Sequence, residues 1–126
     1  MTLKGALRIL FALFFVLGGV NHFRNPAFYV RMMPPYLPLH RELVYLSGIA
    51  EVVLGILLLI PRTSVMAAWG LIALLLAVFP ANIQMALHPD TFPTLSPTVL
   101  WLRLPLQGAL IAWAYWLTRP TRRIEL

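Results

Sequence analysis

The sequence predicts an all-α integral membrane protein, a four-helix transmembrane bundle with a short interfacial helix between spans 1 and 2. Of its 126 residues, 60% are hydrophobic and only 11% are charged, and the mean hydropathy is +0.82. Ordinary soluble domains carry about 25% charged residues, so this balance indicates a chain that lies in lipid. Four apolar segments account for it, and each is long enough to cross ~30 Å of hydrocarbon. We expect residues 1–126 to form a single transmembrane domain.

The first predicted span covers residues 3–22, with Lys4 and Arg8 ahead of its apolar run. A signal peptide has a similar shape, but we expect the segment to be retained as a spanning helix. One face of this helix combines aromatic rings with small residues that permit close helix packing. The members of this face include Phe11, Phe15, Gly18, Gly19 and His22.

A short amphipathic helix is predicted after the first span, over residues 27–33. Asn25 is a suitable N-cap, Pro26 suits the first helical position, and Pro34-Pro35 ends the segment. Its apolar and aromatic side chains fit either a connector at the membrane interface or a lid over a cavity. The sequence leaves both interpretations open.

The second predicted span, residues 41–60, contains an acidic residue in its middle. Glu51 lies about ten residues from either end, near the bilayer midplane, where a carboxylate costs about 2.5–3.5 kcal/mol. It should therefore face the interior of the bundle. At 100° per residue, small and polar residues share its face. That face contains Val44, Ser47, Gly48, Glu51, Gly55 and Leu58.

The third predicted span covers residues 64–87 and the fourth covers 98–117. In the third, Pro80 removes a helical hydrogen bond close to Asn82, which marks either a cavity or a bend for packing. In the fourth, Arg103 and Gln107 lie one turn apart on one face. Aromatic residues near the ends of the fourth span predict interfacial anchors. These are Trp101, Trp113, Tyr115 and Trp116.

The distribution of charge predicts the topology. Four spans put both termini on one side, which collects six of the ten basic residues, and the positive-inside rule then makes the N and C termini cytoplasmic. The net charge of +6 lies at segment ends, where it predicts contact with membrane lipids and no nucleic acid partner.

Composition also limits the chemistry. The chain has no cysteine, so it forms no disulfide and offers no thiolate. No metal-ligand spacing, phosphate loop or nucleophile elbow is present, so we expect no metal site and no covalently bound cofactor. The sequence leaves open whether the protein is an enzyme and favours one that does not act alone.

Polar residues from all four spans are predicted to gather in the extracytoplasmic half of the bundle, with Glu51 deepest and His22 near the mouth. One explanation is a structural staple in which Glu51 reaches Arg103 directly or through neighbouring polar groups. The other is a pocket for an amphipathic ligand with a carbonyl or hydroxyl head, such as a quinone or lipid. The candidate polar residues are His22, Ser47, Glu51, Asn82, Arg103 and Gln107, and the candidate apolar pocket wall is Phe11, Phe15 and Phe79.

Five ordered motifs resemble the DoxX-like family of small four-helix bacterial membrane proteins over essentially the whole chain. They are Gly19-Val20-Asn21-His22-Phe23, Met33-Pro34-Pro35-Tyr36-Leu37-Pro38, Ser47-Gly48-Ile49-Ala50-Glu51, Phe79-Pro80-Ala81-Asn82-Ile83 and Arg103-Leu104-Pro105-Leu106-Gln107. The resemblance implies a multi-pass protein of the bacterial inner membrane. It also implies a link to quinone-coupled sulfur oxidation, through a thiosulfate:quinone oxidoreductase subunit of that family. The family is similar as well to an animal four-helix chaperone that assists nicotinic receptor assembly.

We therefore expect an accessory membrane protein that binds a quinone- or lipid-like molecule, alongside a membrane oxidoreductase or another membrane subunit. Glu51 would exchange a proton or hydrogen bond with the head group, and Arg103 would stabilise that carboxylate or an anionic ligand. The alternative is an assembly factor or scaffold with a purely structural polar cluster, and a homo-oligomer fits either. A proton or small-solute pathway is less favoured, because the cytoplasmic half lacks polar steps.

Overall fold

The computed structural model describes residues 2–92 and 95–119, and all regular structure in this part of the chain is helical. The all-α prediction is confirmed. In chain order the helices are α1 (Leu3–Arg24), α2 (Pro26–Met32), α3 (His40–Leu58), α4 (Ser64–Leu87), the 3-10 helix η1 (Pro89–Thr91) and α5 (Pro97–Thr118). The four long helices lie in the four predicted apolar segments.

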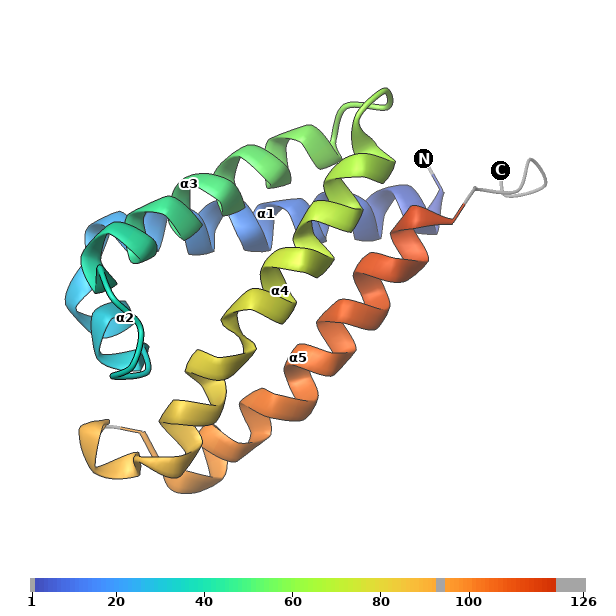
Figure 1. Ribbon diagram of the computed structural model, residues 1–126. Helices are drawn as coiled ribbons and strands as arrows, with labels where there is room; N and C mark the ends of the chain where they lie inside the picture. The colour runs from blue at the N-terminus through green and yellow to red at the C-terminus, as the bar shows by residue number, and fades with distance from the viewer. Residues whose placement is uncertain (1, 93–94, 120–126) are drawn as a thin grey trace.

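The long helices form two pairs that together make a wedge. Helix α1 packs along α3, and α4 packs along α5 (Figure 1). The pairs converge at a narrow end, where α1 begins and α5 ends, and diverge towards a wide end at α2. At the narrow side the rings of Phe11 and Trp113 lie 4.8 Å apart. The site described below lies where the pairs separate.

Glycine lets α1 and α3 approach closely. A Cβ atom on Gly19 would lie 2.5 Å from the carbonyl oxygen of Gly48, closer than real Cβ atoms come to any neighbour. One on Gly55 would lie 3.0 Å from the carbonyl oxygen of Ala12. Any side chain at these positions would push the helices apart. The predicted inward face of α3 is confirmed, because Val44, Gly48, Gly55 and Leu58 are buried.

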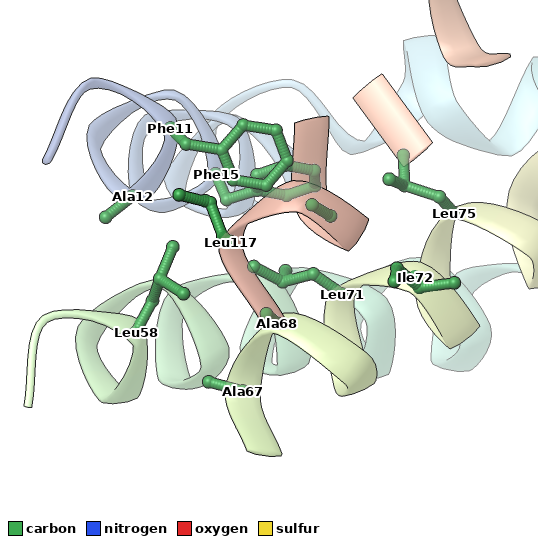
Figure 2. Close-up of a cluster of buried hydrophobic side chains, with 11 residues drawn as sticks. Phe11, Ala12, Phe15, Leu58, Ala67, Ala68, Leu71, Ile72, Leu75 and Leu117 are labelled. Carbon is green, nitrogen blue, oxygen red and sulfur yellow. The ribbon is translucent and has the colours of Figure 1, made fainter. Parts of the chain in front are cut away.

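A hydrophobic core fills the narrow part of the wedge (Figure 2). All four long helices contribute to it, with Phe11, Phe15, Leu58, Leu71 and Leu117 among its members. Trp113 is partly buried and packs against this core, and its role as an interfacial anchor stays a prediction. The predicted anchors Trp101, Tyr115 and Trp116 keep much of their surface exposed.

Helix α2 covers the wide end. It contacts α1, α3 and α4, and the ring of Phe28 lies 5.6 Å from that of Phe92 in an edge-on arrangement. Asn25 stands at its N-cap position, as predicted, but its side chain makes no capping hydrogen bond. Its backbone N–H instead donates to the Asn21 carbonyl and ends α1. Since α2 closes one end of the wedge, it lies where a lid would lie.

Within the described residues, α1 and α4 are long and apolar enough to cross a membrane. Helix α3 has only 19 residues. A stretch of it long enough to span a membrane contains three charged residues, Arg41, Glu42 and Glu51. Helix α5 contains Arg103, Gln107 and two prolines, at positions 97 and 105. Membrane crossing by α3 and α5 therefore stays a prediction.

Candidate ligand-binding cavity

A cavity of about 400 Å³ lies between the two helix pairs, and we call it the main cavity. Its volume falls within the range of small-molecule sites, about 300–1,000 Å³. One wall comes from α1 and α3, the facing wall from α4 and α5, and residues of α2 and the following segment close it. The structure brings all six candidate polar residues to its lining. They are His22, Ser47, Glu51, Asn82, Arg103 and Gln107.

On the α1–α3 wall, His22 and Glu51 form a pair. Nε2 of His22 lies 3.1 Å from Oε2 of Glu51, and the two side chains are only 10% and 13% exposed. Nδ1 of His22 lies 2.7 Å from the Gly18 carbonyl oxygen, which can only accept a hydrogen bond, so Nδ1 carries a hydrogen. Nε2 then either accepts from a carboxylic acid or, as imidazolium, donates to a carboxylate. The pair can hold one exchangeable proton at the edge of the cavity.

Tyr29 of α2 fixes the histidine ring. The two rings stack with their centroids 3.9 Å apart, and the Tyr29 hydroxyl accepts a 2.7 Å hydrogen bond from Nδ2 of Asn21. Tyr29 also lines the main cavity. Sequence reasoning missed this residue, because it lies beyond a helix break where periodicity carries no information about contacts with α1. His22 was predicted near the mouth of the cavity, and the structure shows that Tyr29 of α2 covers it.

On the α4–α5 wall, a hydrogen-bonded chain joins the two helices. Nδ2 of Asn82 donates to Oε1 of Gln107, and Nε2 of Gln107 donates to the Leu75 carbonyl. Oδ1 of Asn82 is buried and has no hydrogen-bond partner. Pro80 also lines the cavity, which agrees with the prediction that this proline marks a cavity.

Arg103 does not meet Glu51, so the predicted staple between them is wrong. Glu51 is paired with His22, and Nε of Arg103 is buried without a partner. Glu51 belongs to the α1–α3 pair and Arg103 to the α4–α5 pair, and these pairs diverge towards the wide end (Figure 1). Across residues 2–92 and 95–119, no hydrogen bond or ion pair joins the polar side chains of one cavity wall to those of the other. Ser47 lines the α1–α3 wall and donates to its own helix, at the Val44 carbonyl.

The apolar lining differs from the prediction. Phe15 lines the main cavity, but Phe11 and Phe79 do not. Phe11 lies one turn nearer the narrow end, where the pairs have converged, and it is fully buried in the core. The lining instead includes Phe14 of α1 and Leu106 of α5. These two side chains are 54% and 57% exposed, so they lie at the edge of the cavity. The remaining apolar lining is mostly aliphatic.

The donor set suits hydrogen bonding and proton exchange. No group of three or more His, Cys, Asp or Glu side chains in the described ranges could hold a metal ion. Arg103 presents N–H donors, the carboxyl of Glu51 and Oδ1 of Asn82 present acceptors, and Nε2 of His22 lies within hydrogen-bond distance of that carboxyl. The main cavity can therefore hold a molecule whose polar oxygens lie next to an apolar body.

Comparison with protein families gives a match over residues 11–118, to a model described as "Domain of unknown function (DUF8561)". The matched region contains every polar residue of the main cavity. Comparison with curated proteins gives no match, and neither does comparison with solved structures.

Proposed function

Because the chain belongs to the DUF8561 family, whose function is unknown, we propose from its geometry that it is a four-span membrane protein that binds a small amphipathic molecule in the main cavity. The termini would lie in the cytoplasm of a bacterial cell and the main cavity in the outer half of the inner membrane. The observation that carries the binding proposal is the arrangement of polar groups on two facing walls that do not reach each other.

The outward faces of the helices support immersion in lipid. Large apolar side chains on all four long helices are about half exposed or more. Water-soluble monomers rarely leave contiguous apolar patches beyond a few hundred Å² uncovered, whereas acyl chains would cover these faces. Examples are Leu10, Leu17, Ile49, Ile56, Leu76 and Leu102. The acidic residue in the middle of α3 would be tolerated in lipid because it faces His22.

The unpartnered polar atoms support a bound ligand. A buried polar atom without a partner destabilises a protein by about 1–3 kcal/mol. Nε of Arg103 and Oδ1 of Asn82 are two such atoms, both on residues that line the main cavity. A molecule that accepts from Arg103 and donates to Asn82 or Glu51 would satisfy these groups and connect the two walls.

This chemistry favours a quinone or a lipid with a similar head group. A quinone ring carries oxygen atoms on opposite sides, so one can accept from Arg103 while the other lies near the His22–Glu51 pair. In the quinol form, a hydroxyl can donate to the carboxylate. The apolar lining would contact the ring and tail. The resemblance to DoxX-like proteins points to the same ligand class, and under it the protein would serve a membrane oxidoreductase as an accessory subunit.

One feature favours the alternative of an assembly factor or scaffold. The His22–Glu51 pair fastens α1 to α3, and the Asn82–Gln107 bond fastens α4 to α5, as a purely structural cluster would do. That role accounts less well for Arg103, because its side chain makes no hydrogen bond or ion pair with another described residue and its Nε is buried without a partner. We therefore place ligand binding first.

Extraction of the purified protein with organic solvent, followed by mass spectrometry, tests ligand binding. We expect a quinone or lipid in stoichiometric amounts from the native protein, and about tenfold less after Arg103→Gln or Glu51→Gln. Glu42→Gln is the matched control, because Glu42 is an exposed carboxylate in the first turn of the same helix. Equal recovery from all variants would favour the scaffold.

Single cysteines test the four spans, since the native chain has none. Arg62→Cys lies between α3 and α4, and Asp90→Cys lies in η1. Four spans require a membrane-impermeant thiol reagent to label Asp90→Cys in intact spheroplasts, and Arg62→Cys only after lysis. Labelling of both from the same side would contradict the proposed topology.

A further inference from the structure

A second cavity, of about 270 Å³, lies at the narrow end of the wedge, and we call it the terminal cavity. It is bounded by α1, by the connection between α3 and α4, and by the end of α5. Arg8, Ser64 and Arg119 contribute polar groups to its lining, and Leu58, Val65 and Leu117 contribute apolar ones. The hydrophobic core separates it from the main cavity.

The terminal cavity contains hydrogen-bond donors without acceptors. Nε of Arg8 is buried and has no partner. Ser64 is only 8% exposed, and its Oγ also has no partner. Arg119 donates from one terminal nitrogen to the Tyr115 hydroxyl, at 3.2 Å, which leaves other N–H groups of its guanidinium for a ligand. No acidic residue lines this cavity in the described part of the chain.

The start of α4 adds to this positive character. Ser64 is the first residue of that 24-residue helix. Thr63, at the N-cap position, makes no side-chain cap, and its hydroxyl donates to the Leu57 carbonyl at 2.8 Å. The first backbone N–H groups of α4 thus lack a capping acceptor, and the helix dipole favours an anion there.

We propose that the terminal cavity binds a phosphate group, carried either by a lipid head group or by free phosphate. The phosphate oxygens would accept from the Arg8 guanidinium, from Ser64 Oγ and from N–H groups at the start of α4. The apolar residues beside them would contact the glycerol and first acyl carbons of a lipid. This site does not depend on the proposed function of the main cavity, and it uses none of the main cavity's residues.

Binding of two probes to the detergent-solubilised full chain tests this site. One probe is inorganic phosphate, measured by calorimetry, and the other is dioleoyl phosphatidylglycerol, measured by native mass spectrometry. We expect Arg8→Gln to weaken binding about tenfold, because it removes charge-assisted hydrogen bonds. Ser64→Ala should weaken it about threefold or more, since Ser64 is not the helix cap and its replacement leaves the fold intact.

Arg62→Gln is the matched control. Arg62 is exposed at the same end of the molecule and does not line the terminal cavity, so its loss should change binding less than about twofold. Binding of inorganic phosphate would assign the site to free phosphate, and binding of phosphatidylglycerol alone would assign it to a lipid. Absence of binding to both probes would overturn the proposal, and so would equal effects of Arg62→Gln and Arg8→Gln. If Arg8→Gln fails to fold by circular dichroism, an unchanged affinity in Ser64→Ala would overturn it.

Discussion

His22 and Glu51 meet at 3.1 Å because their helices approach each other through glycine. A Cβ atom on Gly18 would lie 3.0 Å from Oε1 of Glu51, and one on Gly48 would lie 2.8 Å from Cβ of His22. The pair therefore occupies space that larger residues at these positions would fill. The close packing of α1 on α3 and the polar wall of the main cavity have one physical cause.

Gly48→Ala should destabilise the fold. The added methyl would lie 2.8 Å from Cβ of His22 and 3.0 Å from the Gly19 carbonyl oxygen, and neither is the flexible end of a side chain. Overpacking of this kind costs about 1–3 kcal/mol, so the melting temperature in detergent should fall. Gly108→Ala is the control, because its Cβ would meet nothing within 4 Å. Helix propensity predicts that Gly108→Ala is more stable than the native protein, by up to about 1 kcal/mol. An unchanged melting temperature for Gly48→Ala would contradict the close approach of the two helices.

Glu51 and His22 should be energetically coupled. In a double-mutant cycle of His22→Gln and Glu51→Gln, the coupling energy should be about 0.5–3 kcal/mol, as for other residues in contact. The quantity to measure is the apparent free energy of unfolding in an SDS titration. Pairing Glu51→Gln with Arg103→Gln gives the control cycle, since these residues do not touch and their effects should add. Coupling in the control cycle and additivity in the first would restore the staple between Glu51 and Arg103.

The sequence was informative about helices and about which residues face inward. The predicted segment 64–87 coincides with α4, and the predicted span 41–60 ends two residues beyond α3. The earlier end of α3 is consistent with Pro61, because residues before a proline disfavour helical geometry. Hydrophobic periodicity depends on local geometry alone, so it placed Glu51 and Gln107 correctly towards the interior.

The partner of Glu51 was not predictable in the same way. Counting depth along each helix treats the helices as parallel and starts them all at one surface. Here α1 and α3 diverge from α4 and α5 (Figure 1), whereas glycine contacts hold α1 against α3, so Glu51 pairs with His22 of the neighbouring helix. The angle between helix pairs depends on which side chains interlock, and no single segment contains that information. Phe11 lies in the core and outside the cavity lining for the same reason, because the helix pairs have converged at its level.

Replacement of Gln107 should lower stability, whereas replacement of Arg103 should lower ligand binding, although both residues line the main cavity. Gln107→Leu removes the bonds to Asn82 and to the Leu75 carbonyl and leaves the buried Asn82 amide without its partner, so we expect a loss of about 1–3 kcal/mol. Arg103→Leu removes no hydrogen bond to a described residue, so stability should be unchanged or higher while ligand recovery falls. Thermal unfolding and extracted-ligand mass spectrometry on both variants make the comparison. A large loss of stability in Arg103→Leu would show a structural role for that residue.

The variants Phe11→Ala and Phe14→Ala should distinguish a residue that packs in the core from one that lines the cavity. Phe11 is fully buried among residues of the hydrophobic core, and large-to-small changes of this type cost about 3–5 kcal/mol. Phe14 is 54% exposed and borders the main cavity, so Phe14→Ala leaves less of a void and should cost about 1 kcal/mol or less. Its effect should instead fall on the ligand, because the main cavity loses an aromatic contact and widens at its edge. Unfolding in SDS together with ligand recovery tests both variants. If Phe14→Ala unfolds as readily as Phe11→Ala, its ring belongs to the core, and the main cavity ends before it reaches the outer face of α1.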